Sequence, residues 1–183
     1  MYISKTPIAG VFVVETQSFE DHRGAFARFF CAEELAPLLG EKHIVQINHS
    51  RTDQVGAVRG MHFQYPPHGE MKFVRCLRGR VFDVAVDLRQ GSPTFLQWYG
   101  EELAPESKKM LVIPEGCAHG FQVLEPESEL FYLHTAPYCP DSEGGVNVMD
   151  KIIGITWPLE LSDRSDRDKE LSFLDFNYNG ILL

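Results

Sequence analysis

The sequence lacks the cysteine spacing of a cross-linked or zinc-binding scaffold. Its four cysteines, Cys31, Cys76, Cys117 and Cys139, lie far apart and form no Cys-x-x-Cys pair. The chain has 183 residues, 44% of them hydrophobic, and a chain of this length buries roughly 70% of the surface that it exposes when unfolded. It therefore needs no disulfide or structural metal in order to fold. We predict free thiols and a cytoplasmic location, because reducing compartments keep cysteines unpaired.

Basic charge and long hydrophobic runs are also scarce. Seventeen Lys and Arg residues stand against 26 Asp and Glu residues, which gives a net charge of -9. That sign opposes binding to a nucleic-acid backbone through summed positive charge. The longest apolar run near the start, residues 8–14, is too short to span a membrane and follows no basic segment. We therefore predict no nucleic-acid partner and no membrane partner.

No repeat, low-complexity tract or linker divides the chain, so we predict one domain over residues 1–183. Over residues 81–88, apolar residues at every second position predict a strand with one apolar face. Helical patterns are confined to residues 32–39 and 165–174. Similar strand-like runs, separated by turn-forming groups, occupy residues 95–99, 110–113, 120–124 and 129–135. This spacing predicts an all-β protein, an antiparallel β-sandwich or barrel with a few short helices.

Residues 58–64 carry polar and titratable side chains in a strand-like sequence. Arg59 and His62 are three positions apart, so on a regular strand they point to opposite faces. Gly60 is the residue that could permit a bulge and change this arrangement. The structural alternative is an ordinary hydrogen-bonded histidine beside an edge arginine.

The segment Pro114-x-Gly116-x-x-His119 fits the second cupin motif, in which a tight turn brings the histidine to the mouth of a β-barrel. The first cupin motif is incomplete. The motif here runs His62-x-Gln64, then Glu70, then Gly79, so Gln64 replaces the second histidine of its His-x-His, and a side-chain amide is a poor substitute for imidazole at a transition metal. We therefore predict a cupin-type fold without a metal or other cofactor.

Polar residues inside such a barrel could carry out proton transfer. His62 suits a general base near neutrality, and Lys72 could stabilise a developing oxyanion. Tyr132 could donate a proton from the other side of a ligand, and Asp168 could hydrogen-bond His62. The structural alternatives are a surface lysine, an amphipathic core tyrosine, and a capping box in which Ser165 and Asp168 open a short helix.

These segments, in this order along nearly the whole chain, resemble the dTDP-4-dehydrorhamnose 3,5-epimerase family, cupin-fold enzymes of deoxysugar nucleotide biosynthesis. Each segment alone is a weak signal, and the set in register is specific. The segments are Phe19-Glu20-Asp21-His22-Arg23-Gly24, Gln46-x-Asn48-x-Ser50, Val58-Arg59-Gly60-Met61-His62-Phe63-Gln64, Lys72-Phe73-Val74-Arg75, Phe82-Asp83-Val84-Ala85-Val86-Asp87-Leu88-Arg89, Ile113-Pro114-x-Gly116-x-Ala118-His119-Gly120-Phe121, Gly154-Ile155-x-Trp157-Pro158, Leu161-Ser162 and Ser165-Asp166-Arg167-Asp168.

The resemblance implies an epimerase that acts on a nucleoside-diphosphate 4-keto-6-deoxyhexose, whose C4 keto group acidifies the hydrogens on C3 and C5. By analogy, His62 is the base, Asp168 orients it, Lys72 stabilises the enolate oxygen, and Tyr132 returns a proton on the opposite face. The resemblance also implies the groups that bind the substrate. These are Arg23, Arg59, His119 and Arg167 around the diphosphate, with Gln46, Asn48, Tyr138 and Glu143 completing the pocket. Arginines bind phosphate well, so an acidic chain can still hold a dianion.

Two departures from the family pattern concern the nucleotide. Arg28, in the nucleotide-binding region, replaces the family's usual glutamate, and Met149-Asp150-Lys151 replaces its usual Trp-Asp/Asn-Asp-Pro run. Thymidine is the expected base, and a different nucleotide or an unusual sugar is the alternative. The sequence leaves open epimerisation at C3 only or C5 only, a sugar ketoisomerase, and a cupin that binds its ligand without turnover. The relatives are homodimers, and an N-terminal strand able to pair across a two-fold axis predicts a homodimer here.

Overall fold

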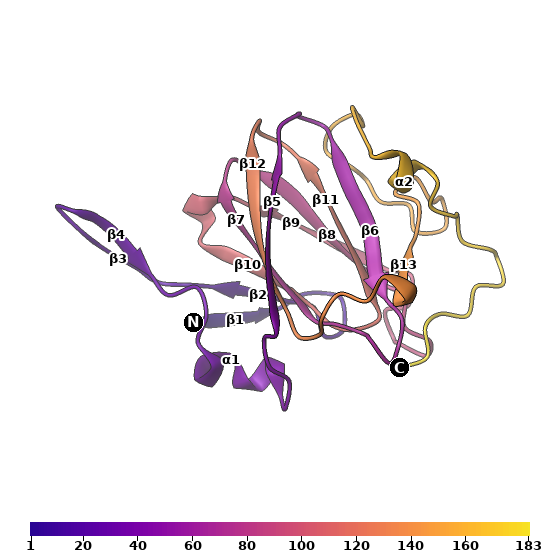
Figure 1. Cartoon of the computed structure of the whole chain (residues 1–183), viewed down its shortest axis with the longest axis horizontal. Helices are drawn as coiled ribbons and strands as arrows, with labels where there is room; N and C mark the ends of the chain where they lie inside the picture. Colours follow the sequence, from indigo (N-terminus) through magenta and orange to yellow (C-terminus); the bar gives the residue numbers. More distant parts are fainter.

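Two antiparallel sheets form a sandwich in the computed structural model, which describes residues 1–183 (Figure 1). The six-stranded sheet contains, in spatial order, β1 (Tyr2–Lys5), β2 (Phe12–Glu15), β10 (Lys109–Ile113), β7 (Lys72–Arg78), β12 (Ser128–His134) and β5 (Gln46–Thr52). The five-stranded sheet contains β13 (Glu143–Gly145), β6 (Val58–Gln64), β11 (Cys117–Val123), β8 (Val81–Asp87) and β9 (Trp98–Leu103). The predicted all-β sandwich is confirmed.

Apolar side chains pack in three layers around the two sheets. A cluster between the sheets joins residues of both, such as Val74 of β7 and Phe121 of β11. A second cluster covers the outer face of the five-stranded sheet, where the segment after β13 contributes Val146 and Ile153. A third lies on the outer face of the six-stranded sheet. Each sheet therefore has its outer face covered by other parts of the chain, and the first cluster fills only part of the space between the sheets.

The helices differ in how well their patterns predicted them. Helix α1 (Ala32–Leu39) has the predicted bounds, and its Leu35 and Leu39 pack in the third cluster. Helix α2 (Asp166–Lys169) is a single turn, much shorter than the predicted 165–174. After the helix, the carbonyls of Leu171 and Ser172 accept hydrogen bonds from the side-chain amide and the backbone N–H of Asn147 (3.0 Å each), which tie this stretch to the segment after β13. Two 3-10 turns complete the elements, Pro105–Ser107 and Pro140–Ser142.

Strand β9 begins later than its pattern predicts. Residues 95–97 belong to a turn, in which the backbone N–H of Phe95 donates to the carbonyl of Ser92 (3.2 Å). The carboxylate of Asp87 holds this turn by accepting from Ser92 Oγ (2.5 Å) and Thr94 Oγ1 (2.7 Å). The prediction of a strand over 95–99 is therefore wrong in its first three residues, because a buried aspartate overrides the local apolar pattern.

A separate hairpin of β3 (Ser18–Asp21) and β4 (Gly24–Ala27) projects from the sandwich (Figure 1). Two aromatic side chains of the hairpin, Phe19 and Phe26, are 67% and 72% exposed. The hairpin therefore buries little apolar surface against its own chain. No helix of this fold has both the length and the apolar content needed to cross a membrane.

Candidate active site

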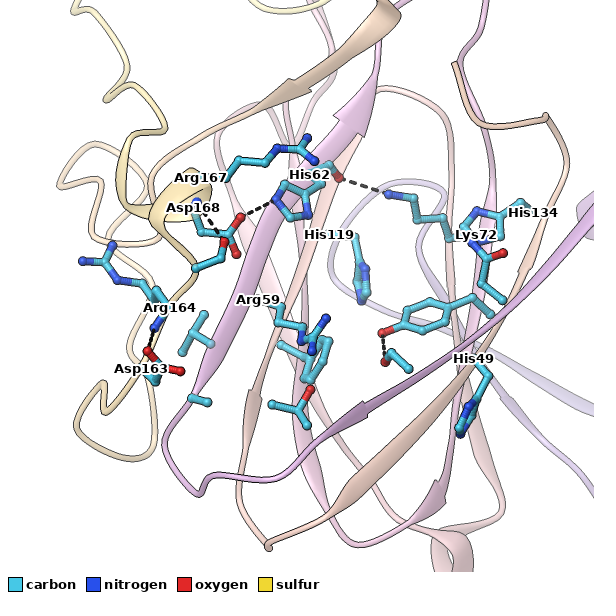
Figure 2. A pocket seen from close by; sticks show the side chains of 18 of the residues that line it. His49, Arg59, His62, Lys72, His119, His134, Asp163, Arg164, Arg167 and Asp168 are labelled. Carbon is cyan, nitrogen blue, oxygen red and sulfur yellow. Dashed lines mark hydrogen bonds and ion pairs between the residues drawn. The ribbon is translucent and has the colours of Figure 1, made fainter. Parts of the chain in front are cut away.

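A cavity of about 800 Å³ lies between the two sheets (Figure 2). Its walls come from β5, β6, β7, β11 and β12, and one side is closed by residues 163–168. Its polar lining residues are Asn48, His49, Ser50, Thr52, Arg59, His62, Lys72, His119, Tyr132, His134, Asp163, Arg164, Ser165, Arg167 and Asp168. This volume lies within the roughly 300–1,000 Å³ of typical small-molecule sites.

A bulge at Gly60 brings two predicted residues to the same cavity. On β6 and β11, His62 lies opposite His119 while Arg59 lies opposite Phe121, so β6 carries one extra residue between them. Gly60 has φ +129°, and a Cβ there would lie 2.6 Å from the Cα of Gly120. Only glycine fits such a close approach in that conformation. The predicted bulge is confirmed, and both Arg59 and His62 line the cavity.

Asp168 lies against this bulge and pairs with His62. Its Oδ1 is 2.8 Å from His62 Nε2, and its Oδ2 accepts the backbone N–H of Gly60 at 3.1 Å. The backbone N–H of Asp168 donates to Ser165 Oγ (3.1 Å), so Ser165 caps α2 as well. The two alternatives from the sequence are therefore compatible, because the cap uses the backbone of Asp168 and leaves its carboxylate for the histidine.

The charge of Asp168 suits a partner of an imidazolium ion. Burial raises the pKa of this carboxyl, but the hydrogen bond and charge of His62 and the N–H of Gly60 outweigh burial, so its pKa lies below the ordinary value. An ionised carboxylate at this place fixes the orientation of the ring and stabilises its protonated form.

We expect Asp168→Asn to lower the free energy of unfolding at neutral pH, and this loss to shrink as the pH falls below about 4. A carboxyl whose folded pKa is depressed stabilises the fold above its unfolded pKa, and the contribution disappears as the pH falls through the folded pKa. Urea unfolding of wild type and variant over this pH range measures the difference. A gap that stays constant down to the acid end would show that ionised Asp168 does not stabilise the fold.

Lys72 and Tyr132 occupy the facing sheet, on the neighbouring strands β7 and β12. The Lys72 ammonium group donates to the backbone carbonyl of His62 across the cavity (3.2 Å). The Tyr132 hydroxyl lies 3.0 Å from Ser50 Oγ. Burial raises the pKa of the Tyr132 phenol far above its ordinary value, so the group keeps its proton near neutrality. One wall thus carries a histidine–carboxylate pair, and the other carries an ammonium group and a protonated phenol.

His119 lies inside the cavity rather than at its mouth. The residue is 6% exposed, and its Nε2 is 2.7 Å from Asp83 Oδ1 on the adjacent strand β8. Burial raises the pKa of Asp83, although the neighbouring His119 and Lys72 oppose that rise. The turn before β11 therefore delivers His119 to an inner wall, because its ring pairs with a buried carboxyl instead of facing solvent.

Three further predicted residues form the rim beside Arg167. Glu143 accepts a hydrogen bond from the Tyr138 hydroxyl (2.6 Å) and forms an ion pair with Arg167. Gln46 accepts the backbone N–H of Tyr138 (2.9 Å) and donates to Asn48 Oδ1 (3.3 Å). The rim is therefore one connected set of polar groups next to the cavity.

The remaining two predicted residues, Arg23 and Arg28, lie outside the cavity of this chain. Both are exposed, Arg23 at the turn of the β3–β4 hairpin and Arg28 just after it. Arg23 pairs with Asp21 (2.5 Å) and Arg28 with Glu34 (2.6 Å). The expectation that they line the same pocket as His62 is thus not met within one chain, because the hairpin that carries them projects from the body (Figure 1).

A family model described as dTDP-4-dehydrorhamnose 3,5-epimerase matches residues 5–175. The chain belongs to the dTDP-4-dehydrorhamnose 3,5-epimerase family. The protein of that name from Salmonella typhimurium is 43% identical over 177 residues, which cover 96% of each chain. The cupin-type sandwich predicted from the sequence is the fold of this epimerase family.

Two solved structures have similar folds. The dTDP-6-deoxy-D-glucose-3,5-epimerase of Legionella pneumophila, in complex with dTDP-4-keto-L-rhamnose, has a TM-score of 0.89 and 40% identity, and the match covers 94% of this chain and 92% of that one. ChmJ of Streptomyces bikiniensis, a 3'-monoepimerase in complex with dTDP-quinovose, has a TM-score of 0.85 and 32% identity, with 92% and 85% covered. One structure with a similar fold is thus described as a 3'-monoepimerase.

Some polar residues of this epimerase-family cavity are absent from the predicted set. Ser50 and His134 each lie two positions from a predicted residue on the same strand, so the alternation of β-strands could have found them. Arg164 lies in an irregular segment without periodicity. Asp83 does not line the cavity itself but pairs with His119, which does; it alternates with apolar residues, and that pattern normally indicates a solvent-facing carboxylate.

The family cavity does not offer the donor set of a metal site. The side-chain amide of Gln64 is hydrogen-bonded to backbone groups. It donates to the carbonyl of His68 (2.8 Å) and accepts from the N–H of Cys139 (2.6 Å). Glu70 pairs with His134 and Lys72. No group of three or more His, Cys, Asp or Glu side chains is placed to hold a metal ion. The residues present therefore do not fit a cupin metal.

We expect protein purified without a chelator to contain far less than one equivalent of transition metal. Gln64 and Glu70 are committed to other partners, and amides are weak ligands for such ions. Elemental analysis of the purified protein measures this directly. Stoichiometric iron, manganese or zinc, together with turnover that depends on it, would contradict the expectation.

Proposed function

We propose that the chain inverts C3 and C5 of a dTDP-4-keto-6-deoxyhexose. The observation that supports this most strongly is the placement of His62 and Asp168 on one wall of the cavity and of Lys72 and protonated Tyr132 on the other. A base and an acid on opposite walls can take a proton from one face of a carbon and return one to the other face. The names of the Salmonella and Legionella relatives support the choice of substrate.

In the proposed reaction, His62 removes a proton from a carbon next to the C4 carbonyl. The electron pair of that C–H bond forms the double bond of an enolate, and the carbonyl π pair moves onto the C4 oxygen. The Lys72 ammonium group hydrogen-bonds this oxygen, and Asp168 stabilises the imidazolium ion. Tyr132 then protonates the same carbon from the opposite face while the carbonyl re-forms. The phenolate regains a proton and the imidazolium loses one, so the product is an isomer of the substrate.

The arginines at the cavity support binding of the diphosphate. Arg59 and Arg167 line it together with Arg164, while Asn48 and the rim of Gln46, Tyr138 and Glu143 complete the pocket. One guanidinium group can bind two phosphate oxygens through two parallel N–H···O hydrogen bonds. The proposed base is thymine, and comparison of the affinities of several nucleoside diphosphates tests it, since tighter binding of another base would assign a different nucleotide.

We further propose that the chain works as a homodimer, in the cytoplasm, with residues 1–183 as one domain. Strand β1 is an unpaired edge of the six-stranded sheet, and the hairpin holds Arg23 and the exposed Phe19 and Phe26 away from the body. A partner would cover these surfaces and bring the hairpin arginines to a binding site. The cytoplasmic location is supported by the four free thiols of the chain, which suit a reducing compartment. Light scattering should give about twice the 20.8 kDa of one chain, and a monomer at working concentration would contradict the dimer.

Epimerisation at one carbon is the second candidate, supported by the likeness to ChmJ. Incubation with dTDP-4-keto-6-deoxyglucose in D2O, followed by NMR, separates the possibilities. Deuterium at C3 and C5 with inversion at both supports the proposed function. Deuterium at one carbon indicates a monoepimerase, a ketose product indicates a ketoisomerase, and deuterium at neither carbon indicates a binding protein.

A further inference from the structure

Glu70 and His134 form a buried pair that the proposed proton transfer does not use, in which His134 lines the cavity and Glu70 lies behind it. Their side chains are 8% and 9% exposed, and Glu70 Oε2 lies 2.7 Å from His134 Nδ1. The other carboxylate oxygen, Oε1, lies 3.3 Å from Lys72 Nζ. His134 and Lys72 are register partners on β12 and β7, and Figure 2 shows them together at one wall. One carboxylate thus joins a histidine and the lysine of the site.

We infer that Glu70 and His134 are positioning residues that hold the Lys72 ammonium group where the C4 oxygen of the substrate becomes negative. The inference deepens the function proposed above and rests on it. It assigns Glu70, which does not line the cavity, a role through Lys72 rather than through contact with the substrate.

A series of hydrogen bonds runs from the backbone of Tyr138 through Gln46 and Asn48 to His134, and the backbone N–H of Tyr138 determines which group donates at each step. The backbone N–H of Tyr138 can only donate, so the Gln46 atom that faces it must be the oxygen, Oε1 (2.9 Å). Gln46 then presents its NH2 group to Asn48, whose facing atom must be Oδ1 (3.3 Å). Asn48 in turn presents its NH2 group to His134 Nε2 (3.3 Å). The amide orientations therefore follow from one backbone donor and not from a choice between amide flips.

This direction sets the tautomer of His134. A ring nitrogen that accepts from Asn48 carries no proton, so Nε2 is bare and the single proton lies on Nδ1. That proton points to Glu70 Oε2. The ring of His134 also stacks on Tyr132, with centroids 6.1 Å apart and an angle of 23°. A neutral ring at this position adds no second positive charge beside Lys72 and the phenol.

At the other end of this series of hydrogen bonds, Glu70 holds the ammonium group of Lys72 in place. Burial raises the pKa of Glu70, but the hydrogen bond from His134 and the charge of Lys72 outweigh it, so the carboxyl is ionised at neutral pH. Lys72 has three N–H donors. Glu70 Oε1 and the carbonyl of His62 occupy two of them, at 3.3 and 3.2 Å. The third is left for an oxygen inside the cavity.

Glu70→Gln tests the role, because it keeps the shape of the side chain and removes its charge. A charged hydrogen bond of this kind corresponds to roughly 10- to 100-fold, so we expect kcat to fall by about that factor. KM for the sugar nucleotide should change by less than about threefold, because Glu70 does not reach the substrate. His134→Asn should lower kcat less, and the double variant should lose little more than Glu70→Gln alone, since both residues act on one lysine.

Glu129→Gln is the matched control. Glu129 also pairs with a histidine, His49, at 3.0 Å, but this pair is more exposed than Glu70 and His134, and Glu129 does not line the cavity or contact Lys72. We expect this variant to keep the kcat of wild type. Circular dichroism and urea unfolding then show whether Glu70→Gln is as well folded as the control.

The tautomer of His134 gives a readout that needs no turnover. Long-range 1H–15N spectra of the wild-type protein, with His134→Asn for assignment, should show the proton on Nδ1 and a bare Nε2 at neutral pH. A proton on Nε2, or a folded Glu70→Gln that keeps the kcat of wild type, would overturn the inference. Absence of turnover in wild type would instead remove the proposed function, and the tautomer would still decide whether the line of hydrogen bonds exists.

Discussion

His62→Ala is expected to lower kcat by ~10²–10⁴-fold, the usual contribution of a general base. The ring pairs with Asp168 at 2.8 Å and lines the cavity, and its other nitrogen has no hydrogen bond within the protein. Each of the other cavity histidines has a carboxylate partner elsewhere, His49 with Glu129, His119 with Asp83 and His134 with Glu70. Turnover of the 4-keto sugar nucleotide, followed at saturating substrate, measures the loss.

Removal of His62 also leaves the buried carboxylate of Asp168 without its partner. A control variant is therefore needed to separate loss of the base from loss of stability. His62→Asn keeps a donor that can face Asp168 and lacks a comparable base, and it should lose turnover to a similar extent while unfolding closer to wild type. Affinity for the nucleoside diphosphate should remain similar in both variants, because the arginines are untouched. Near-wild-type turnover in either folded variant removes His62 from the mechanism.

Tyr132→Phe is expected to lower the rate of inversion by ~10²–10⁴-fold while preserving removal of hydrogen from carbon. The phenol is the protonated group on the wall opposite His62. Without it, the enolate can regain a proton only from the face where His62 lies, and this restores the starting configuration. In D2O the variant should therefore exchange hydrogen for deuterium faster than it forms inverted product.

The ratio of exchange to inversion distinguishes a proton donor from a packing residue. Ser50→Ala is the useful comparison, because it removes the hydrogen-bond partner of the phenol (3.0 Å) and keeps the phenol itself. We expect Ser50→Ala to change both rates together and Tyr132→Phe to separate them. Equal loss of exchange and inversion in Tyr132→Phe would contradict its assignment as the donor.

Local sequence predicted the elements of the site well where one residue type decides the geometry. Gly60 was the residue that could bend a strand between Arg59 and His62, and the close approach of Gly120 shows why no side chain fits there. Ser165 was recognisable as a cap of α2 from its spacing to Asp168. The meeting of Asp168 with His62 spans 106 positions in the sequence, so the local pattern offered it only as an alternative to a capping box, and the family resemblance favoured it.

Strand β8 shows the limit of periodicity. Its apolar face packs outward, where Val84 and Val86 lie under the segment that follows β13. The mixed face, with Asp83, points into the sandwich and contacts His119. Alternation identified the strand but could not show which face lies between the sheets, because in this fold a polar cavity occupies the inside and an apolar cluster covers the outside.

The local sequence pattern also could not predict the positions of side chains whose partners lie far away in the sequence. Arg23 and Arg28 carry no signal that their hairpin leaves the body of its own chain. Glu70 was recognised only as part of the incomplete cupin motif, and its burial follows from the pairing of β7 with β12, which brings His134 beside it. Contacts between strands far apart in sequence therefore determine what remained hidden.

The central claim is that an imidazole removes hydrogen from the carbons next to the C4 carbonyl. The rate at which the C3 and C5 hydrogens of dTDP-4-keto-6-deoxyglucose exchange in D2O, compared between wild type and His62→Ala, tests this step before any inversion occurs. The account predicts rapid exchange in wild type and exchange slower by ~10²–10⁴-fold in the variant. Exchange in His62→Ala at the rate of wild type would contradict it, because another group would then be removing the proton.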